Sequence, residues 1–158
     1  MGENAIAAVS EALQQLLAEA MLSDPPLLES REHVVLASPA EMVRDRDTRL
    51  AIFLYRLHEH VLSRPEAMHI QGPLGFVLSY LIVPIGPEAL PCQRILARVL
   101  RTLHVHAQLQ IQEAGGELTV AVLRHQLEEA TRMWSALRTP YRCAVYCEVR
   151  IARLGDAA

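Results

Sequence analysis

The segment that most constrains the fold is 134–154, WSALRTPYRCAVYCEVRIARL, near the end of the chain. We expect it to begin as the last turn of a helix, to turn a corner at Thr139-Pro140 and to continue as one long strand. One face of that strand carries Tyr141, Cys143, Val145, Cys147, Val149 and Ile151, and the other carries Arg142, Ala144, Tyr146, Glu148 and Arg150. This alternation predicts one face on the core and one face in water or against a partner. A strand of this length needs neighbours, so we expect a sheet.

Composition narrows the chemistry that the chain can perform. All 15 basic residues are arginine, which excludes a Schiff-base lysine, a phosphate-loop lysine and a lysine general base. The formal net charge of −3 gives no reason to expect nucleic acid as a partner. Apolar residues make up 51% of the chain, enough for a real core. We expect one domain over residues 1–158, with an ordered part at about 5–154.

The N-terminal residues and the cysteines indicate the cellular compartment in which the protein is expected. Residues 1–17 lack a basic region followed by an apolar run, so no secretion signal is expected. The longest nearly apolar run, 76–85, has about half the length of a membrane span. The three cysteines are an odd number. Together these features favour a soluble, reduced, cytoplasmic protein.

Periodicity along the chain predicts three helices, at about 5–20, 91–106 and 126–137, with Asn4 as the N-cap of the first. Strands are expected at 33–39, 49–58 and 76–84, and a hairpin turns at Gly115-Gly116 between the strands that contain 109–111 and 118–122. With the final strand, this order predicts an α+β fold. Its core is a single mixed, largely antiparallel sheet of about five strands, with three helices packed mainly on one face.

Several side chains have an expected environment. Apolar residues lie on both faces of 49–58, with Leu57 on the face of Tyr55, which favours a central place in the sheet. Trp134 shares the inner face of its helix with Leu127, so we expect it in the core. The helical ridge of Arg94, Arg98 and Arg101 is expected to face solvent or a protein, and the loops 41–48 and 61–75 are candidate contact surfaces.

The sequence contains no recognisable catalytic or cofactor motif: it has no G-x-S-x-G, no G-x-G-x-x-G and no phosphate loop. His58 and His60 would lie about 6–7 Å apart on one side of a strand, a spacing that can chelate zinc but that lacks a marked third ligand. Cys143 and Cys147, about 13 Å apart along a strand, are expected on the core face rather than in a disulfide or a zinc site. We therefore expect no cofactor and no metal.

Several segments, in their order and spacing, resemble one protein family. They are the helix IAAVSEALQQLL, the strand IFLYRLHEH with Leu54-Tyr55-Arg56, the segment around Ser79-Tyr80-Leu81, the helix RILARVLRTLH, and MWSALRTPYRCAVYCEVRI. This set resembles the N-terminal domain of the cap, or tail-terminator, proteins of extracellular contractile injection systems of the antifeeding-prophage type. The resemblance covers nearly the whole chain and implies a phage tail-terminator-like fold.

The resemblance implies a structural protein rather than an enzyme. Such a protein forms a ring, expected to be hexameric, at the baseplate-distal end of the inner tube, where it ends polymerisation of tube and sheath and anchors the last sheath layer. The implied partners are further copies of the chain, the inner tube protein and the sheath protein, with no nucleic acid and no membrane. Sheath arms would add as a strand at a free sheet edge. The protein would assemble in the cytoplasm and then belong to a released or cell-associated injection particle.

The candidate interface residues are Arg142, Tyr146, Glu148 and Arg150 on the face of the final strand that is expected to face solvent, and Arg44 and Arg46 in the charged loop 41–48. Two other functions stay open. One is a small soluble α+β adaptor domain, which would differ from a terminator only in its assembly. The other is a metal-assisted hydrolase using His58 and His60, which the missing third ligand and the scarcity of aspartate disfavour.

Overall fold

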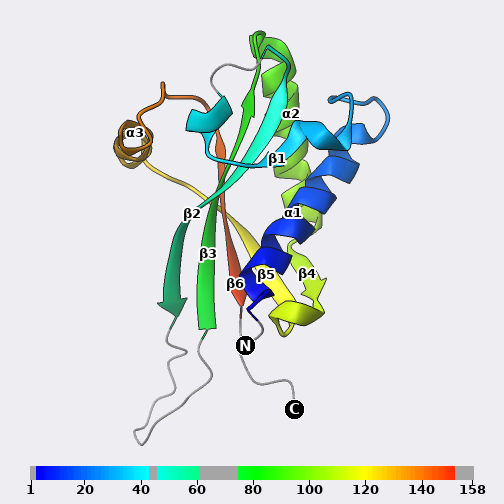
Figure 1. Ribbon diagram of the computed structural model, residues 1–158, viewed down its shortest axis with the longest axis vertical. Coiled ribbons are helices and arrows are strands. Elements are labelled where there is room, and N and C mark those ends of the chain that lie inside the picture. The colour runs from blue at the N-terminus through cyan, green and yellow to red at the C-terminus, as the bar shows by residue number, and fades with distance from the viewer. Residues whose placement is uncertain (1–2, 43–45, 61–74, 152–158) are drawn as a thin grey trace, which may run out of the picture.

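The computed structural model describes residues 3–42, 46–60 and 75–151 (Figure 1). Its α-helices are α1 Ala5–Leu22, α2 Ala89–Val105 and α3 Leu127–Ala136. Its strands are β1 Val34–Leu36, β2 Arg49–His60, β3 Gly75–Ile85, β4 Gln108–Ile111, β5 Gly116–Leu123 and β6 Val145–Ile151. Short 3₁₀-helices occur at η1 Arg31–His33, η2 Pro39–Met42 and η3 Gln112–Ala114.

The strands form one six-stranded sheet in the order β1-β2-β3-β6-β5-β4. β1 runs parallel to β2, and the other pairings are antiparallel. The expected α+β class and the mixed, largely antiparallel sheet are confirmed, with six strands where about five were expected. The short segments β1 and β4 both pair with a longer neighbour and form the two edges of the sheet.

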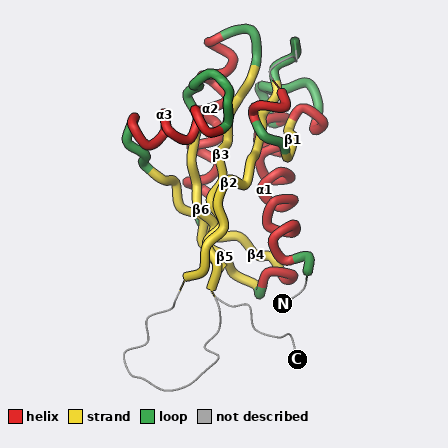
Figure 2. Tube along the Cα trace, turned by 60° about the vertical axis from the view of Figure 1, so that its left-hand side comes forward, coloured by secondary structure: helices red, strands yellow, loops and turns green. Residues whose placement is uncertain are grey.

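The helices cover the two faces of the sheet unequally (Figures 1 and 2). α1 and α2 lie on one face, where their apolar side chains form the larger core with strand residues such as Ile52, Tyr80 and Cys147. α3 lies on the other face, where Trp134 packs in a smaller core with Leu81. The expectation of helices mainly on one face is therefore confirmed, and Trp134 is a core residue, as expected.

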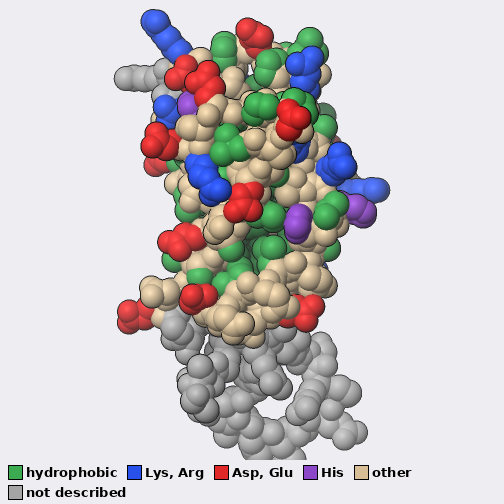
Figure 3. Space-filling model, turned by 90° about the vertical axis from the view of Figure 1, so that its right-hand side faces the viewer, with side chains coloured by type: hydrophobic (Ala, Val, Ile, Leu, Met, Phe, Trp, Pro, Cys, Tyr) green, Lys and Arg blue, Asp and Glu red, His purple; other side chains and the backbone are tan. Residues whose placement is uncertain are grey.

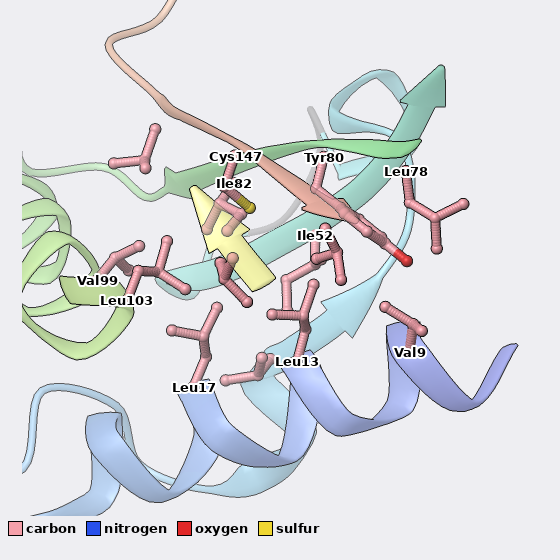
Figure 4. Packing of buried hydrophobic residues seen from close by; sticks show 14 of the residues in the cluster. Val9, Leu13, Leu17, Ile52, Leu78, Tyr80, Ile82, Val99, Leu103 and Cys147 are labelled. Carbon is pink, nitrogen blue, oxygen red and sulfur yellow. The ribbon is translucent and has the colours of Figure 1, made fainter. Parts of the chain in front are cut away.

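The apolar stripe of α1 lies at the centre of the larger core (Figure 4). Val9, Leu13, Leu17 and Met21 recur every fourth residue, which places them on one face of the helix, and all are fully buried. α1 contacts β1 at one edge of the sheet and β4 and η3 at the other. One helix therefore spans the inner side of the curled sheet from edge to edge.

α1 is also the one helix among the described residues that is long and apolar enough to cross a membrane, with a mean hydropathy of 1.2. Its outer face carries exposed Glu11, Gln15 and Glu19. Its apolar residues are those that pack against the sheet. Core packing thus accounts for the composition of this helix, as the sequence predicted.

One hydrogen bond lies at the margin of this core. The hydroxyl oxygens of Ser10 in α1 and Tyr80 in β3 lie 2.8 Å apart, although the two residues are 70 positions apart in the sequence. Burial raises the pKa of Tyr80 to about 12, since the charged phenolate would lose its hydration. The bond gives the hydroxyl of the buried Tyr80 ring a polar partner, and it fixes how α1 is rotated against the sheet.

β2 departs from simple alternation at Tyr55. The pairing with β3 shifts between Leu54 and Arg56, so that Tyr55 is an extra residue, a β-bulge. Beyond the bulge the two faces of the strand exchange. Leu57 pairs with Leu78 of the larger core, on the face opposite to Tyr55. The expected grouping of Leu57 with Tyr55 is wrong, because alternation does not foresee a bulge.

Three expectations near the end of the chain also need correction. β6 begins at Val145 rather than at Tyr141, because residues 137–144 form a turn after α3, with Arg138 at φ 53°, followed by an irregular segment. Cys143 lies in this irregular segment and is exposed, whereas Cys147 is in the strand and buried. Leu127, expected to face inward, is 68% exposed because it is the first residue of α3.

We predict that Leu13→Ala lowers the free energy of unfolding by about 2–5 kcal/mol, because it leaves a cavity in the fully buried stripe of α1. Leu127→Ala is the matched control, since this helical leucine is 68% exposed and its truncation should cost less than about 0.5 kcal/mol. Urea denaturation of both variants measures the difference. Equal losses in the two variants would contradict the central place of α1 in the core.

Candidate interaction surfaces

The predicted interface residues of the final strand fall into two environments, and Tyr146 is in the core. Tyr146 is 7% exposed and lies beneath α3, where the indole Nε1 of Trp134 donates a hydrogen bond of 3.0 Å to its hydroxyl. Burial raises the pKa of Tyr146. Its assignment as a surface contact is therefore corrected. Alternation identifies the second face of a strand, but it does not reveal which helix covers that face.

Glu148 and Arg150 lie further along the same face of β6, towards the end of the strand. That end lies below α3 in Figure 1. The side chain of Arg150 is 56% exposed and that of Glu148 is 17% exposed, and the two groups are 3.5 Å apart. Exposed Arg56 of β2 lies in the row of Glu148, and exposed Thr119 of β5 lies beside Arg150. We call Arg56, Thr119, Glu148 and Arg150 the open sheet face. Among the described residues, no helix covers it.

The other predicted arginines are not part of this face. Arg142 is half-buried before β6 and lines a groove of about 310 Å³ together with Cys92 and Cys143. Arg46 is exposed between η2 and β2. Arg44 lies outside the described residues. The structure thus brings Glu148 and Arg150 together and places Arg142 at the opposite end of β6.

The histidine pair considered as a metal site is only partly described. His58 is half-buried, and its Nδ1 is shielded from solvent without a hydrogen-bond partner in the described part of the chain. The side chain of His60 lies outside that part. Within residues 3–42, 46–60 and 75–151, no three His, Cys, Asp or Glu side chains come together as a metal site. The described residues therefore do not supply His58 with two further ligands.

A chain of polar contacts that the sequence did not predict ties α3 to the sheet. The hydroxyl of Tyr55 lies 3.1 Å from Nε2 of His125, and Nδ1 of His125 lies 3.2 Å from a carboxylate oxygen of Glu129. The ring of His125 meets the ring of Tyr146 edge-on, with centroids 4.6 Å apart. Burial raises the pKa of Tyr55. No local pattern reveals this contact, because the bulged Tyr55 and His125 are 70 residues apart.

Two grooves flank α1 on the helical side of the molecule. The first, of about 490 Å³, lies between α1 and the edge strand β1. Its charged lining consists of Glu11, Glu32 and Arg31, and the Arg31 guanidinium lies 3.8 Å from the carboxylate of Glu19. We call it the acidic groove, since its one arginine already has a carboxylate partner. Nε2 of Gln14 donates a 2.8 Å hydrogen bond to the carbonyl of Val34 and so satisfies one backbone group at this edge of the sheet.

The second groove, of about 690 Å³, lies between α2 and the end of α1. Its charged lining consists of Arg94, Arg98, Arg101 and Asp24, and we call it the arginine groove. Arg98 is turned inward, and its guanidinium donates to the carbonyls of Ala20, Ser23 and Pro25 at 3.3, 3.1 and 2.7 Å. Arg94 and Arg101 are exposed, and no described carboxylate lies within 4 Å of either. Two of the three ridge arginines are therefore available to a partner.

The fold is similar to that of two solved structures. A sheath/tube terminator in the extended state, from the extracellular contractile injection system PVC, matches with a TM-score of 0.68 and 19% identity over 99% of this chain and 59% of that one. The tube-terminating cap of the anti-feeding prophage matches with a TM-score of 0.62 and 19% identity over 95% of this chain and 55% of that one. The chain spans less than two thirds of either protein.

Sequence comparison decides the family. The profile of the Pvc16 N-terminal domain matches residues 8–158. The chain belongs to the Pvc16 N-terminal domain family. A comparison with curated proteins gave no significant match. The family resemblance in the sequence is confirmed, and the six-stranded sheet with its three helices is the form that the Pvc16 N-terminal domain takes in this chain.

The placement of Tyr146 in this Pvc16 N-terminal domain can be tested by Tyr146→Phe, which leaves the buried indole N–H of Trp134 without its acceptor. We expect the free energy of unfolding to fall by about 1–3 kcal/mol. Tyr141→Phe is the matched control, because Tyr141 is 51% exposed and should lose less than about 0.5 kcal/mol. Thermal or urea denaturation distinguishes them. A Tyr146→Phe variant of unchanged stability would place this hydroxyl outside the core.

The cysteines of the same domain should differ in reactivity. Cys147 is fully buried, and burial raises its pKa from 9.0 to about 12, whereas Cys143 is exposed. Because the thiolate is the reactive form, iodoacetamide at pH 8 should label Cys143 and leave Cys147 unlabelled until the chain unfolds. The raised pKa also means that the contribution of Cys147 to stability is lost as the pH rises from 9.0 to about 12. Peptide masses after labelling check this, and rapid native labelling of Cys147 would contradict it.

Proposed function

We propose that this chain is the structural tail-terminator domain of a contractile injection system. Copies of the chain form a six-fold ring at the baseplate-distal end of the inner tube and sheath. The ring ends polymerisation and anchors the last sheath layer. The observation that carries the proposal is the structural match to a sheath/tube terminator along 99% of the chain. Membership of the Pvc16 N-terminal domain family supports the same assignment.

The proposed role requires binding and no catalysis. The polar chain of Tyr55, His125 and Glu129 joins elements of the fold to one another, with Tyr55 half-buried beneath it. The acidic groove and the arginine groove are open surface features beside α1 rather than enclosed chambers for a small molecule. The hydrolase alternative gains no support, since the described side chains give His58 no second and third metal ligand.

A terminator stops growth by binding a repeating surface without presenting that surface again. A tube grows because each ring offers its far side to the next ring, as in any open head-to-tail assembly. The terminator domain would cover the last ring with one surface and leave a different surface outward. The proposed contacts with tube or sheath are made by the open sheet face, which includes Arg56 and Arg150. Exposed Arg46 and half-buried Arg142 are further proposed contacts. Arginine suits such contacts because its planar guanidinium group can donate two parallel hydrogen bonds to one carboxylate.

Sheath anchoring is assigned to a sheet edge. β4 has β5 on one side and no second described strand on the other, so its backbone groups are available for strand addition. β1 is the other edge, but the carbonyl of Val34 there is already bonded to Gln14. An extended sheath arm would therefore pair along β4. Assembly would take place in the cytoplasm, and the domain would then belong to the injection particle.

A polymerisation assay tests this function. Cognate inner tube protein should form shorter tubes with closed ends when the chain is added, and light scattering should find rings with a mass near six times the monomer mass. Negative-stain images give the length distribution. Tube lengths that stay unchanged at every ratio of the two proteins would reject the terminator and favour the adaptor alternative.

The same assay tests the proposed face through a matched pair of variants. Arg150→Glu reverses a charge on the open sheet face and should weaken the effect on tube length. Arg132→Glu reverses an exposed charge on α3 and should leave the effect unchanged. Equal behaviour of the two variants would remove Arg150 from the contact without affecting the terminator assignment.

A further inference from the structure

The outer face of α2 carries a stripe that resembles an interface more than a solvated surface. Leu90, Arg94, Ala97, Arg101 and Val105 follow one another at three- and four-residue steps, which places them in one row along the helix. All five are exposed, and Leu90 and Val105 at the two ends of the row are 64% and 67% exposed. Arginines among exposed apolar side chains are typical of the contact residues of protein interfaces. We call this row the α2 stripe.

A surface of the opposite character lies on the other side of α1. The acidic groove contains Glu11 on α1 and Glu32 on η1, both exposed, with Leu36 of β1, 43% exposed, beside them. Figure 3 views this side of the molecule, where acidic side chains lie mostly towards the left and lower parts, and arginine side chains lie on both the left and the right. The groove therefore offers both carboxylates and an apolar patch.

We propose that the α2 stripe of one copy of this chain docks in the acidic groove of the next copy. Arg94 and Arg101 would meet Glu11 and Glu32, and an apolar end of the stripe would cover Leu36. Docking of one face of a helix in a groove is a common mode of recognition, and complementary charges add specificity to such a contact. The inference rests on the proposed terminator function, because it names the surface by which the ring would hold together.

The two surfaces suit a ring because they are different and lie on opposite sides of α1. A contact between unlike surfaces is heterologous. A growing row of copies therefore has one free stripe at one end and one free groove at the other, until the ring closes. A pair of copies facing each other symmetrically would instead need one surface that complements itself. Neither surface does, since the carboxylates of the groove would repel each other, and so would the arginines of the stripe.

Charge reversal gives a direct test in the intact chain. The stripe variant is Arg94→Glu with Arg101→Glu, and the groove variant is Glu11→Arg with Glu32→Arg. Each variant alone brings like charges together in every contact, so self-association should weaken by about tenfold or more. Analytical ultracentrifugation at low salt measures it. The matched controls reverse exposed residues outside both surfaces: Arg124→Glu with Arg132→Glu, and Glu113→Arg with Glu128→Arg.

Mixing the two variants provides the decisive outcome. The charge-reversed stripe of the stripe variant complements the charge-reversed groove of the groove variant. The natural stripe of the groove variant likewise complements the natural groove of the stripe variant. An equimolar mixture should therefore associate as the natural chain does, with the two variants alternating. A chain with all four substitutions should also associate. Restoration shows that neither variant was merely misfolded, and its absence, with both variants folded, overturns the interface.

The remaining outcomes separate this inference from the proposed function. If both variants associate normally but fail to shorten tubes, the stripe or the groove binds tube or sheath, and the proposed contact between copies is wrong. If they associate and shorten tubes as the natural chain does, the interface is wrong and the terminator stands. If the natural chain stays monomeric with and without tube protein, both the ring and its interface are rejected. Self-association that does not weaken as the ionic strength rises also contradicts a contact built on these charges.

Discussion

The buried stripe of α1 is the contact on which the rest of the structure depends. The edge strands β1 and β4 have only three and four residues, so each makes few ladder hydrogen bonds with its neighbour. α1 contacts both of them, so its apolar side chains join the two edges across the inner side of the curled sheet. The bonds from Ser10 to Tyr80 and from Gln14 to Val34 fix its rotation and position. Burying this face of the sheet therefore also determines where the two grooves lie, because each is bounded by α1.

Much of this fold could be predicted because local periodicity reflects burial. The four-residue step of α1 and the nearly continuous apolar run of β3 identified both elements, and Gly115 and Gly116 mark the hairpin turn with φ values of 91° and 103°. Periodicity could not predict which helix covers each face of the sheet, or how far along the strands it does so. Tyr146 and Glu148 alternate identically along β6, yet α3 covers only the first of them. The bulge at Tyr55 was equally hidden, because it depends on a pairing with β3 rather than on residues near it.

The candidate contact residues illustrate the same limit at the surface. Arg94, Arg98 and Arg101 share one helical ridge, and their sequence pattern does not distinguish them. In the structure, Arg98 binds three carbonyls at and after the end of α1, where the unpaired backbone carbonyls of a helix attract a cation. That contact removes Arg98 from the partner surface and leaves the arginines on either side of it exposed. The difference arises from a turn some 75 residues earlier in the chain, which only the folded arrangement brings near.

The packing around α1 also bears on how a ring of fixed size could arise. In a heterologous contact, the rotation from one copy to the next depends on the angle between the two unlike surfaces on a single copy. In the proposed contact these surfaces are α2 and the groove beside β1, and both are held against α1 by buried side chains. Close-packed cores deform little, so the angle between the surfaces is held nearly constant. Ring closure would then follow from the core that the sequence encodes most clearly, whereas the charges at the surface would select the partner.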